Sequence, residues 1–474
     1  MVGITAAGAY IPAYRLNRHD IARLWGGRST GGTKAIAGYD EDTVTMAAAA
    51  ALECLKNAGT VADGLSLATT TAPYREKQSA AIIAAVADLP AECHTADFTD
   101  SLRASSIALK SAIDAVKAGS AGNVLVAAAD CRLGAAKGTL EQALGDGAAA
   151  LMIGSEGVIA EIEGSYSVYN DFTDVWRHED DTYIRSAEQR FIDDVGYVPT
   201  VQAAINGLLE KSDLALSDFS KIVYYASDTR QHAGLARRIK LDKAQVQEPL
   251  YDKIGNTGTA AALLMLIAAL ETVGSGDRIL FTAYGDGCDA FALRVTDNIG
   301  KIQGKKLLAG KLEGIIHISY GHYLTWKELV HMEASTLPER SAMSLQSRWR
   351  ERRAISPLYG VKCKKCGTPQ ISQIGQTTRV CVHCQTKDEF EDYKFSDKKG
   401  KLFSYAIDHL QPTQNPPGVN GVIDFDEGGR IICELTDCEI DKVAVGMPVE
   451  MTFRRMFYSR GINNYFWKAK PVTD

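Results

Sequence analysis

The chain has 474 residues, of which 46% are hydrophobic and 23% charged, and its formal net charge is −6. This length fits two or three globular domains, and the charge gives no basis for binding nucleic acid. No apolar run approaches the roughly 20 residues that cross a bilayer, and residues 1–5 do not resemble a signal peptide. We therefore expect a cytoplasmic protein in which the ten cysteines are mostly reduced thiols.

Two segments of the first 300 residues share one pattern. Residues 107–128 predict an apolar helix, a Gly-Ser stop and a strand, and residues 260–283 repeat this order. Gly-Asp-Gly and a further apolar run follow each of them, at 145–147 and 285–287. Helices and strands that are apolar on every side belong in buried layers. The repeat therefore predicts a duplicated, layered α/β protein around two central helices; chance similarity of Ala-rich helices is the alternative.

The offset between the repeats, from Gly119 to Gly274, is 155 residues, and it pairs Leu102 with Thr257. Each position would open a buried helix. A helix N-terminus offers free N–H groups and positive potential, which stabilise thiolates, thioester oxygens and enolates. We expect one helix start from each half to meet at a single site.

The character of the sequence changes beyond this region. We predict two α/β halves at residues 1–165 and 166–334 and a basic, partly helical connector at 335–358. A cysteine cluster at 359–392 and a tail of short strands at 393–474 follow. Short strands separated by Gly and Pro turns indicate a small β-barrel.

The cysteine cluster is typical of a metal site. Two Cys-x-x-Cys pairs separated by fourteen residues supply four thiolates, which is the ligand set of a closed tetrahedral zinc site. A closed coordination shell predicts a structural metal rather than a catalytic one. The expected ligands are Cys363, Cys366, Cys381 and Cys384.

Several motifs resemble prokaryotic 3-hydroxy-3-methylglutaryl-CoA synthases. They are GAYIP at 8–12, GYDEDTVTMA at 38–47, IGNT at 254–257 and YLTWK at 323–327. The resemblance covers about residues 1–330 and implies the duplicated five-layered α/β/α/β/α thiolase fold. Residues from about 335 resemble the rubredoxin-like zinc ribbon plus OB-fold proteins that accompany thiolase-type acyl-CoA enzymes. Those proteins are usually separate polypeptides, and here they are fused.

The catalytic residues that this resemblance implies are mostly replaced. The family's cysteine follows an Ala-Asp pattern that aligns with Ala96-Asp97 and places Leu102 at the nucleophile. The general-base glutamate falls at Thr70 and the histidine near Ser227, whereas the asparagine is kept as Asn256. A register slip of one residue would instead place Ser101 at the nucleophile, at the cost of the flanking matches.

Leucine cannot carry an acyl group, so an acyl-enzyme route is not expected. Aldol chemistry needs a base, an oxyanion hole and a proton donor, but no nucleophile. We therefore predict a (retro-)aldol reaction of a β-hydroxyacyl-CoA, a carbon–carbon lyase activity. The pattern resembles thiolase-like aldolases of steroid side-chain degradation, which also lack the cysteine. Two alternatives stay open: a synthase-like or thiolase-type acyltransferase with an altered site, and a non-catalytic acyl-CoA-binding scaffold subunit of a thiolase complex.

The candidate residues follow from this chemistry. Tyr284, in the turn that faces the active site of thiolase folds, is the first candidate for proton transfer, and it would need nearby positive potential to act as a base. The alternative for Tyr284 is packing within the sheet. His232 and Asp228, on the loop that replaces the family histidine, are candidate partner acids or bases. Asn256 could support the thioester oxygen together with N–H groups near Leu102.

The binding partners follow from the same resemblance. The C-terminal module is expected to offer Arg454 and Arg455 to the phosphates of coenzyme A, which enters as part of the substrate. We expect a homodimer or larger homo-oligomer and an acyl-CoA substrate, and a thiolase-type protein is a candidate further partner.

Overall fold

The computed structural model describes residues 1–313, 315–333, 340–372 and 374–472. These divide into two compact units. The first comprises Met1–Ala37, Asp42–Ala84 and Leu89–Tyr320, and the second comprises Gly38–Glu41, Ala85–Asp88 and Gly321–Asp474. The predicted boundary at 334/335 and the start of the connector at 335–339 lie outside the described residues.

A mixed sheet of nine strands runs through the first unit, and its halves mirror each other. The order is β11-β12-β13-β8-β1-β7-β6-β4-β5, with the two halves joined where β1 pairs with β8. From the centre outwards, each half has two antiparallel pairings and then a parallel one. In the first half these are β1–β7, β7–β6 and β6–β4, and in the second half they are β8–β13, β13–β12 and β12–β11. The first-half strands are β1 (Gly3–Tyr10), β4 (Gly64–Ala68), β5 (His94–Phe98), β6 (Asn123–Asp130) and β7 (Gly147–Gly154), and the second-half strands are β8 (Ala160–Tyr169), β11 (Lys221–Tyr224), β12 (Arg278–Tyr284) and β13 (Gly287–Val295).

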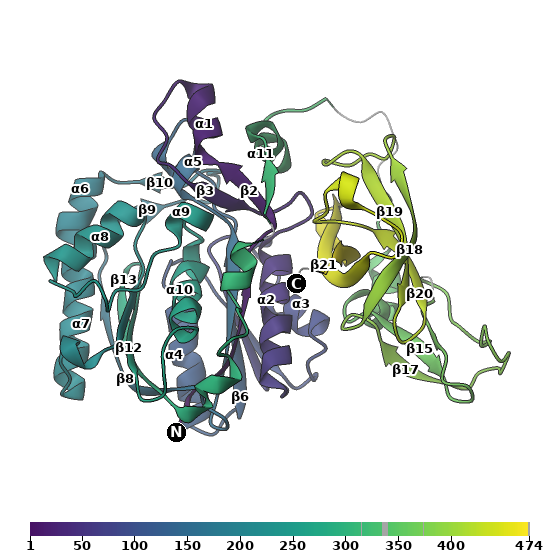
Figure 1. Cartoon of the computed structure of the whole chain (residues 1–474), viewed down its shortest axis with the longest axis horizontal. Coiled ribbons are helices and arrows are strands. Elements are labelled where there is room, and N and C mark those ends of the chain that lie inside the picture. The colour runs from purple at the N-terminus through teal and green to yellow at the C-terminus, as the bar shows by residue number, and fades with distance from the viewer. Residues whose placement is uncertain (314, 334–339, 373, 473–474) are drawn as a thin grey trace. The chain divides into compact units, whose positions relative to one another are not determined.

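Helices fill the space between the two halves and cover their outer faces (Figure 1). The central layer holds α4 (Ala104–Lys117) and α10 (Ala261–Leu270), in which every residue but Ala268 is buried, because it faces strands of both halves. The outer layers hold α2 (Thr43–Ala58) against β1, β6 and β7, and α7 (Val198–Ser212) against β8 and β13. The structure therefore confirms the duplicated five-layered fold.

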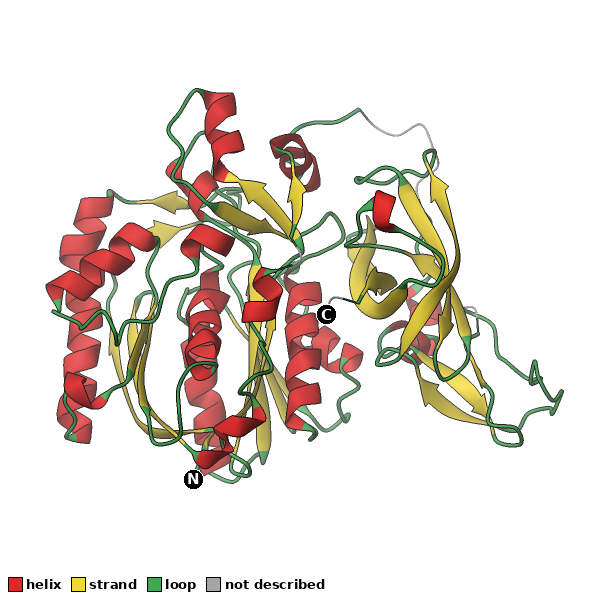
Figure 2. Cartoon of the chain, viewed as in Figure 1, coloured by secondary structure: helices red, strands yellow, loops and turns green. Residues whose placement is uncertain are grey.

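Shorter elements surround these layers in the first unit (Figure 2). A three-stranded sheet is formed by β14 (Ile316–Ile318), β2 (Tyr14–Asn17) and β3 (Thr33–Ile36), and a two-stranded one by β9 (Val175–Trp176) and β10 (Arg185–Ser186). The remaining helices of this unit are α1 (Arg18–Trp25), most of α3 (Ser79–Val86), α5 (Thr139–Ala143), α6 (Gln189–Phe191), the π-helix η1 (Ile192–Tyr197), α8 (Thr229–Arg238), α9 (Tyr251–Ile254) and the 3₁₀ turns η2 (Leu216–Asp218), η3 (Gly258–Ala260), η4 (Asp297–Lys301) and η5 (Ala309–Leu312). The helix α11 (Tyr320–Trp326) belongs to the second unit from Gly321 onward.

The second unit contains a small ribbon and a five-stranded barrel. The ribbon is the sheet of β16 (Pro369–Gln370), β15 (Tyr359–Cys363) and β17 (Phe390–Lys394), preceded by α12 (Leu345–Arg350) and α13 (Arg352–Ile355). The barrel has the order β20 (Arg430–Glu434), β19 (Gly418–Phe425), β18 (Lys399–Asp408), β21 (Pro448–Ser459) and β22 (Ile462–Pro471), with η6 (Ile440–Lys442). A bridge between Leu435 and Ala469 brings the two edge strands together, which confirms the predicted OB-fold barrel.

In the described part of the chain, every helix is too short or too polar to cross a bilayer.

Candidate active site

Leu102 lies on the loop that leads into α4, next to the glycine turn after β12. Ser101 Oγ donates to the carbonyl of Gly285 at 3.1 Å. A Cβ on Gly285 would lie 3.0 Å from Leu102 Cβ and 2.9 Å from the amide nitrogen of Arg103, so only glycine allows this close approach. Among the described residues, none accepts a hydrogen bond from the Leu102 amide.

Arg103 fastens this loop to the second half of the sheet. Its guanidinium donates to the carbonyls of Val168 and Asp286, both at 3.1 Å, and pairs with the carboxylate of Asp289 at 3.3 Å. Ser106, in the first turn of α4, donates to the same carboxylate at 2.5 Å. The start of α4 is thus held by ion-pair and hydrogen-bond contacts rather than by a side-chain cap.

The start of the second central helix reaches the same region. The 3₁₀ turn η3 begins at Gly258, directly after Thr257, leads into α10 and contacts α4. Asp130, at the carboxyl end of β6, accepts from the amide of Thr259 at 2.8 Å. The turn that opens α10 therefore contacts α4, and a single site formed by the two helix starts stays a prediction.

Asp130 also organises the loop at the carboxyl end of β4. One of its carboxylate oxygens accepts from the hydroxyls of Thr69, Thr70 and Thr71 at 2.9–3.1 Å and from the amide of Thr70 at 2.7 Å. Thr70, where the family resemblance places the general base, contributes its hydroxyl and amide to this network. A buried carboxylate with this many donors is structural.

Tyr284 ends β12 and is 4% exposed. Its ring meets the ring of Tyr197 edge-on at 5.0 Å. Burial, and next the negative charge of Asp174, raise the pKa of Tyr284 well above its ordinary value. The raised pKa keeps Tyr284 protonated at pH 7, and the positive potential that a phenol would need to act as a base is opposed by the negative charge of Asp174.

Asp174 was not found from the sequence. It lies in the loop between β8 and β9, is 8% exposed, and accepts from the amide of Val175 at 2.6 Å. Burial raises the pKa of Asp174, and the hydrogen bond from the Val175 amide offsets only part of that rise. Nothing in the spacing of residues 169–174 marks this aspartate, because Tyr284, whose pKa it raises, is 110 positions away.

Asn256 is 3% exposed and is held by its own backbone, which bonds to Ala143 and Gly145 at 2.8 and 3.0 Å. Its side-chain amide donates to Tyr225 Oη at 2.9 Å and to the carbonyl of Ser227 at 3.1 Å, and its oxygen accepts from the amide of Gly258. Both N–H groups are therefore engaged inside the protein.

Tyr225 connects Asn256 to a buried cation. Its hydroxyl accepts from Asn256 and interacts with Arg132, which is 7% exposed. Burial raises the pKa of Tyr225, and the positive charge of Arg132 opposes that rise. Asn256, Tyr225 and Arg132 thus form one polar cluster, and Asp174 acts electrostatically on the same tyrosine.

His232 lies in a helix rather than on the predicted loop, and Asp228 directly precedes that helix. Asp228 caps α8, accepting from the amide of Gln231 at 2.8 Å. His232 lies in α8, is 4% exposed and stacks on Tyr224 with ring centroids 4.3 Å apart. Burial lowers the pKa of His232 to about 4, so the imidazole is neutral at pH 7. These contacts give both residues structural roles.

The four predicted metal ligands come together in the second unit. Their sulfur atoms all lie within 4.8 Å of one another, with Cys363 and Cys384 at 3.7 Å and Cys366 and Cys381 at 3.5 Å. A tetrahedral zinc with Zn–S bonds of about 2.3 Å requires sulfurs about 3.8 Å apart. The arrangement fits that ion and leaves no open coordination position.

Arg454, in contrast, is not exposed to a ligand. It is 1% exposed, and its guanidinium pairs with the carboxylates of Glu41 and Asp437 within the second unit. Arg455 is half-buried and donates from its guanidinium to the carbonyl of Tyr39 at 3.2 Å. These contacts argue against Arg454 as a phosphate ligand and leave Arg455 as the remaining candidate of the two.

Comparison with known proteins agrees with this fold over most of the chain. Hydroxymethylglutaryl-CoA synthase of Methanopyrus kandleri is 32% identical over 345 residues, which cover 69% of this chain and 97% of that protein. The chain belongs to the hydroxymethylglutaryl-CoA synthase family. The synthase of Pyrococcus horikoshii is 33% identical over 324 residues, covering 66% of this chain and 91% of that protein.

Two family models match parts of the chain, and two solved structures share its fold. Residues 209–296 match the C-terminal model of 3-oxoacyl-[acyl-carrier-protein] synthase III, and residues 393–454 match the model "ChsH2, C-terminal OB-fold domain". A crystal structure of HMG-CoA synthase complexed with CoA aligns with a TM-score of 0.64 at 20% identity, over 71% of this chain and 92% of that one. The synthase III of Aquifex aeolicus VF5 aligns with a TM-score of 0.56 at 25% identity, over 62% and 100%.

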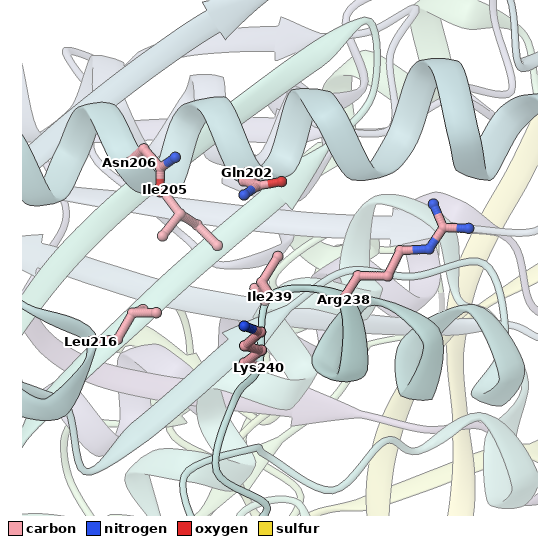
Figure 3. A pocket seen from close by; sticks show the side chains of 7 residues that line it. All are labelled: Gln202, Ile205, Asn206, Leu216, Arg238, Ile239 and Lys240. Atoms are coloured by element: carbon pink, nitrogen blue, oxygen red, sulfur yellow. The ribbon is translucent and has the colours of Figure 1, made fainter.

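A surface pocket of this synthase-family chain lies away from these residues. It is formed between α7, η2 and the end of α8 (Figure 3), and none of the candidate site residues lines it. Its lining residues are Gln202, Ile205, Asn206, Leu216, Arg238, Ile239 and Lys240.

Proposed function

We propose that this member of the synthase family makes or breaks a carbon–carbon bond in an acyl-CoA without forming an acyl-enzyme, most directly in the (retro-)aldol reaction of a β-hydroxyacyl-CoA. Leu102 carries this proposal. It occupies the position that the family resemblance gives to the nucleophilic cysteine, and it lies beside the Gly285 turn. A leucine there removes the acyl-transfer step and leaves the enolate chemistry possible.

The cleavage direction needs no other reactant. A base takes the proton of the β-hydroxyl, the Cα–Cβ bond breaks, and its electron pair moves to the thioester oxygen as an enolate. A ketone or aldehyde leaves, and the enolate carbon takes up one proton. Tyr284 is the proposed proton-transfer residue, and the Leu102 amide is the proposed donor to the thioester oxygen.

Family membership by itself supports the condensing direction more directly than the cleavage direction. The relatives are named synthases, and the chain covers nearly their whole length. A synthase-like reaction is therefore the second candidate. It would require another nucleophile, and the nearest hydroxyl in sequence, that of Ser101, is already bonded to Gly285. For this reason we place it second.

Other features complete the proposal. The four-cysteine cluster would hold a structural zinc, which would fix the ribbon and take no part in the reaction. All ten cysteines are free thiols, which supports a reducing, cytoplasmic location. From the family resemblance we also propose a homodimer and an acyl-CoA substrate, with a thiolase-type protein as a further partner.

The test is deuterium exchange in heavy water with acetyl-CoA, 3-hydroxy-3-methylglutaryl-CoA and straight-chain 3-hydroxyacyl-CoAs. We expect deuterium at the α-carbon and no change in the intact mass of the protein. An acyl adduct on the wild-type chain would support the synthase reading instead. No exchange and no adduct across the panel would refute catalysis and favour a scaffold.

Leu102→Cys provides a positive control for the register. A thiolate at this position would lie at the start of α4 and is expected to gain an acyl adduct from acetyl-CoA. Ile107→Cys, at an exposed position of the same helix, is the matched control and should remain unmodified on that timescale.

A further inference from the structure

Residues Gly38–Glu41, which begin the GYDEDTVTMA motif, belong to the second unit, although the residues on both sides of them belong to the first. These four residues form a tight turn. The amide of Glu41 donates to the carbonyl of Gly38 at 3.0 Å, and the amide of Gly38 donates to the Glu41 carboxylate at 2.8 Å. We call this segment the acidic turn, and the proposed reaction assigns no role to it.

The two acids of the turn are buried against two cations of the barrel. Asp40 is 1% exposed, and its carboxylate lies 2.9 Å from the ammonium of Lys468 in β22. Glu41 is 4% exposed and pairs with the guanidinium of Arg454 in β21. A carboxylate is tolerated in a buried site only when it is paired. Each acid of the turn has such a partner in the barrel.

Backbone and ring contacts add shape to this charge pairing. The ladder between β18 and β21 covers only Pro448–Glu450 of β21. Beyond it, the amide of Arg455 donates to the carbonyl of Asp40 at 2.8 Å, and the Arg455 guanidinium donates to the carbonyl of Tyr39 at 3.2 Å. Lys468 Nζ lies 4.8 Å from the centre of the Tyr39 ring and 3.3 Å from its hydroxyl oxygen. The barrel therefore contacts the backbone, the ring and both carboxylates of the turn.

The two cations also have partners that belong to the barrel itself. The ammonium of Lys468 lies 2.8 Å from the carboxylate of Glu434 in β20, and Arg454 pairs with Asp437. Without the turn, each cation would still face one carboxylate. The charges of the barrel are thus balanced without the turn, which is the arrangement of a binding site rather than of a core that the turn completes.

We propose that the surface formed by Lys468, Arg454 and Arg455 is a receptor for an acidic Gly-Tyr-Asp-Glu turn, with residues 38–41 as its resident ligand. Its specificity is for an aromatic residue followed by two carboxylates. A copy of the turn on a separate molecule binds the same receptor once the resident turn is disabled. In the wild-type chain the covalent link gives the resident turn an effective concentration in the millimolar range, which excludes a free peptide. This inference does not depend on the proposed reaction.

The first experiment disables the resident turn with the double variant Asp40→Asn/Glu41→Gln and leaves the receptor intact. Hydrogen–deuterium exchange is measured on peptides of β21, with β18 and β19 as the internal reference. We expect exchange of β21 to become about 30-fold faster or more, because each buried cation loses a charged partner. The reference strands should stay within about threefold of wild type. The matched control is Glu439→Gln/Asp441→Asn, which removes two acids from exposed positions of the same unit and should leave β21 unchanged.

The second experiment supplies the turn from outside, as a synthetic peptide with the sequence of residues 36–45. At a concentration of about four times its Kd, the peptide should slow the exchange of β21 in the double variant about fivefold. The same peptide with Asn and Gln in place of the two acids should have no effect, and neither peptide should alter the wild-type chain.

Three results would overturn the inference. The first is a folded double variant that the acidic peptide does not protect at millimolar concentration. The second is a double variant in which β18 and β19 exchange as fast as β21, because the turn would then be part of the barrel core. The third is unchanged exchange of β21 in the double variant, because the turn would then stay bound without its charges. None of these results bears on the proposed reaction.

Discussion

Lys468 should be among the most costly charged residues to remove from the second unit. It is 1% exposed, and its ammonium lies 2.9 Å from the carboxylate of Asp40 and 2.8 Å from that of Glu434. Lys468→Met keeps the length of the side chain but leaves two carboxylates in a buried site without their cation. Removal of one partner from a buried ion pair costs about 3–5 kcal/mol.

The matched control is Lys442→Met. Lys442 pairs with Glu439 on the surface and is 78% exposed, so its loss should cost less than about 1 kcal/mol. The assay is hydrogen–deuterium exchange of peptides from β21 and β22. A loss of 3–5 kcal/mol should speed their exchange by about two to four orders of magnitude, with peptides of β6 and β7 unchanged. Exchange within threefold of wild type would refute the reasoning.

The pH dependence of this contribution has a defined sign. Burial alone would raise the pKa of Asp40 and of Glu434, but Lys468 outweighs it and holds both below their ordinary values. The stabilisation is therefore fully present above the unfolded carboxyl pKa of about 4 and is lost as pH falls through the lower folded values. In Lys468→Met, the exchange of β22 should depend less steeply on acid than in wild type.

Two further predictions concern His232 and the cysteine cluster. Burial lowers the pKa of His232 to about 4, so protonation of the unfolded chain should cost the first unit about 2 kcal/mol between pH 7.5 and 5. His232→Phe should lack that part of the loss in thermal unfolding followed by circular dichroism; parallel profiles would contradict it. Cys381→Ser should lose the single zinc that elemental analysis is expected to find per chain, whereas Cys438→Ser, outside the cluster, should keep it. Equal zinc in both variants would exclude the four-sulfur site.

Local and periodic patterns in the sequence were sufficient to predict the architecture. The repeated apolar helix, Gly-Ser stop and strand predicted a duplicated layered fold, because a helix apolar on all sides must be covered on all sides. The two Cys-x-x-Cys pairs identified a ligand set whose sulfurs do come together, because each pair closes a tight turn around one side of a metal. The same applies to the small barrel at the C-terminal end of the chain.

The chemical state of individual side chains did not follow from these patterns. Leu102 could be read from the sequence alone, since leucine lacks a nucleophilic atom in any surroundings. Tyr284, His232 and Arg454 could be singled out by residue type, but burial, stacking and ion pairs decided what each can do. Asp174 carries no sequence signal, because its burial and its electrostatic effect on Tyr284 arise only in the folded chain. Residue identity and spacing thus determined the fold and the missing nucleophile, whereas tertiary packing decided acidity and access, because both depend on neighbours that are distant in the chain.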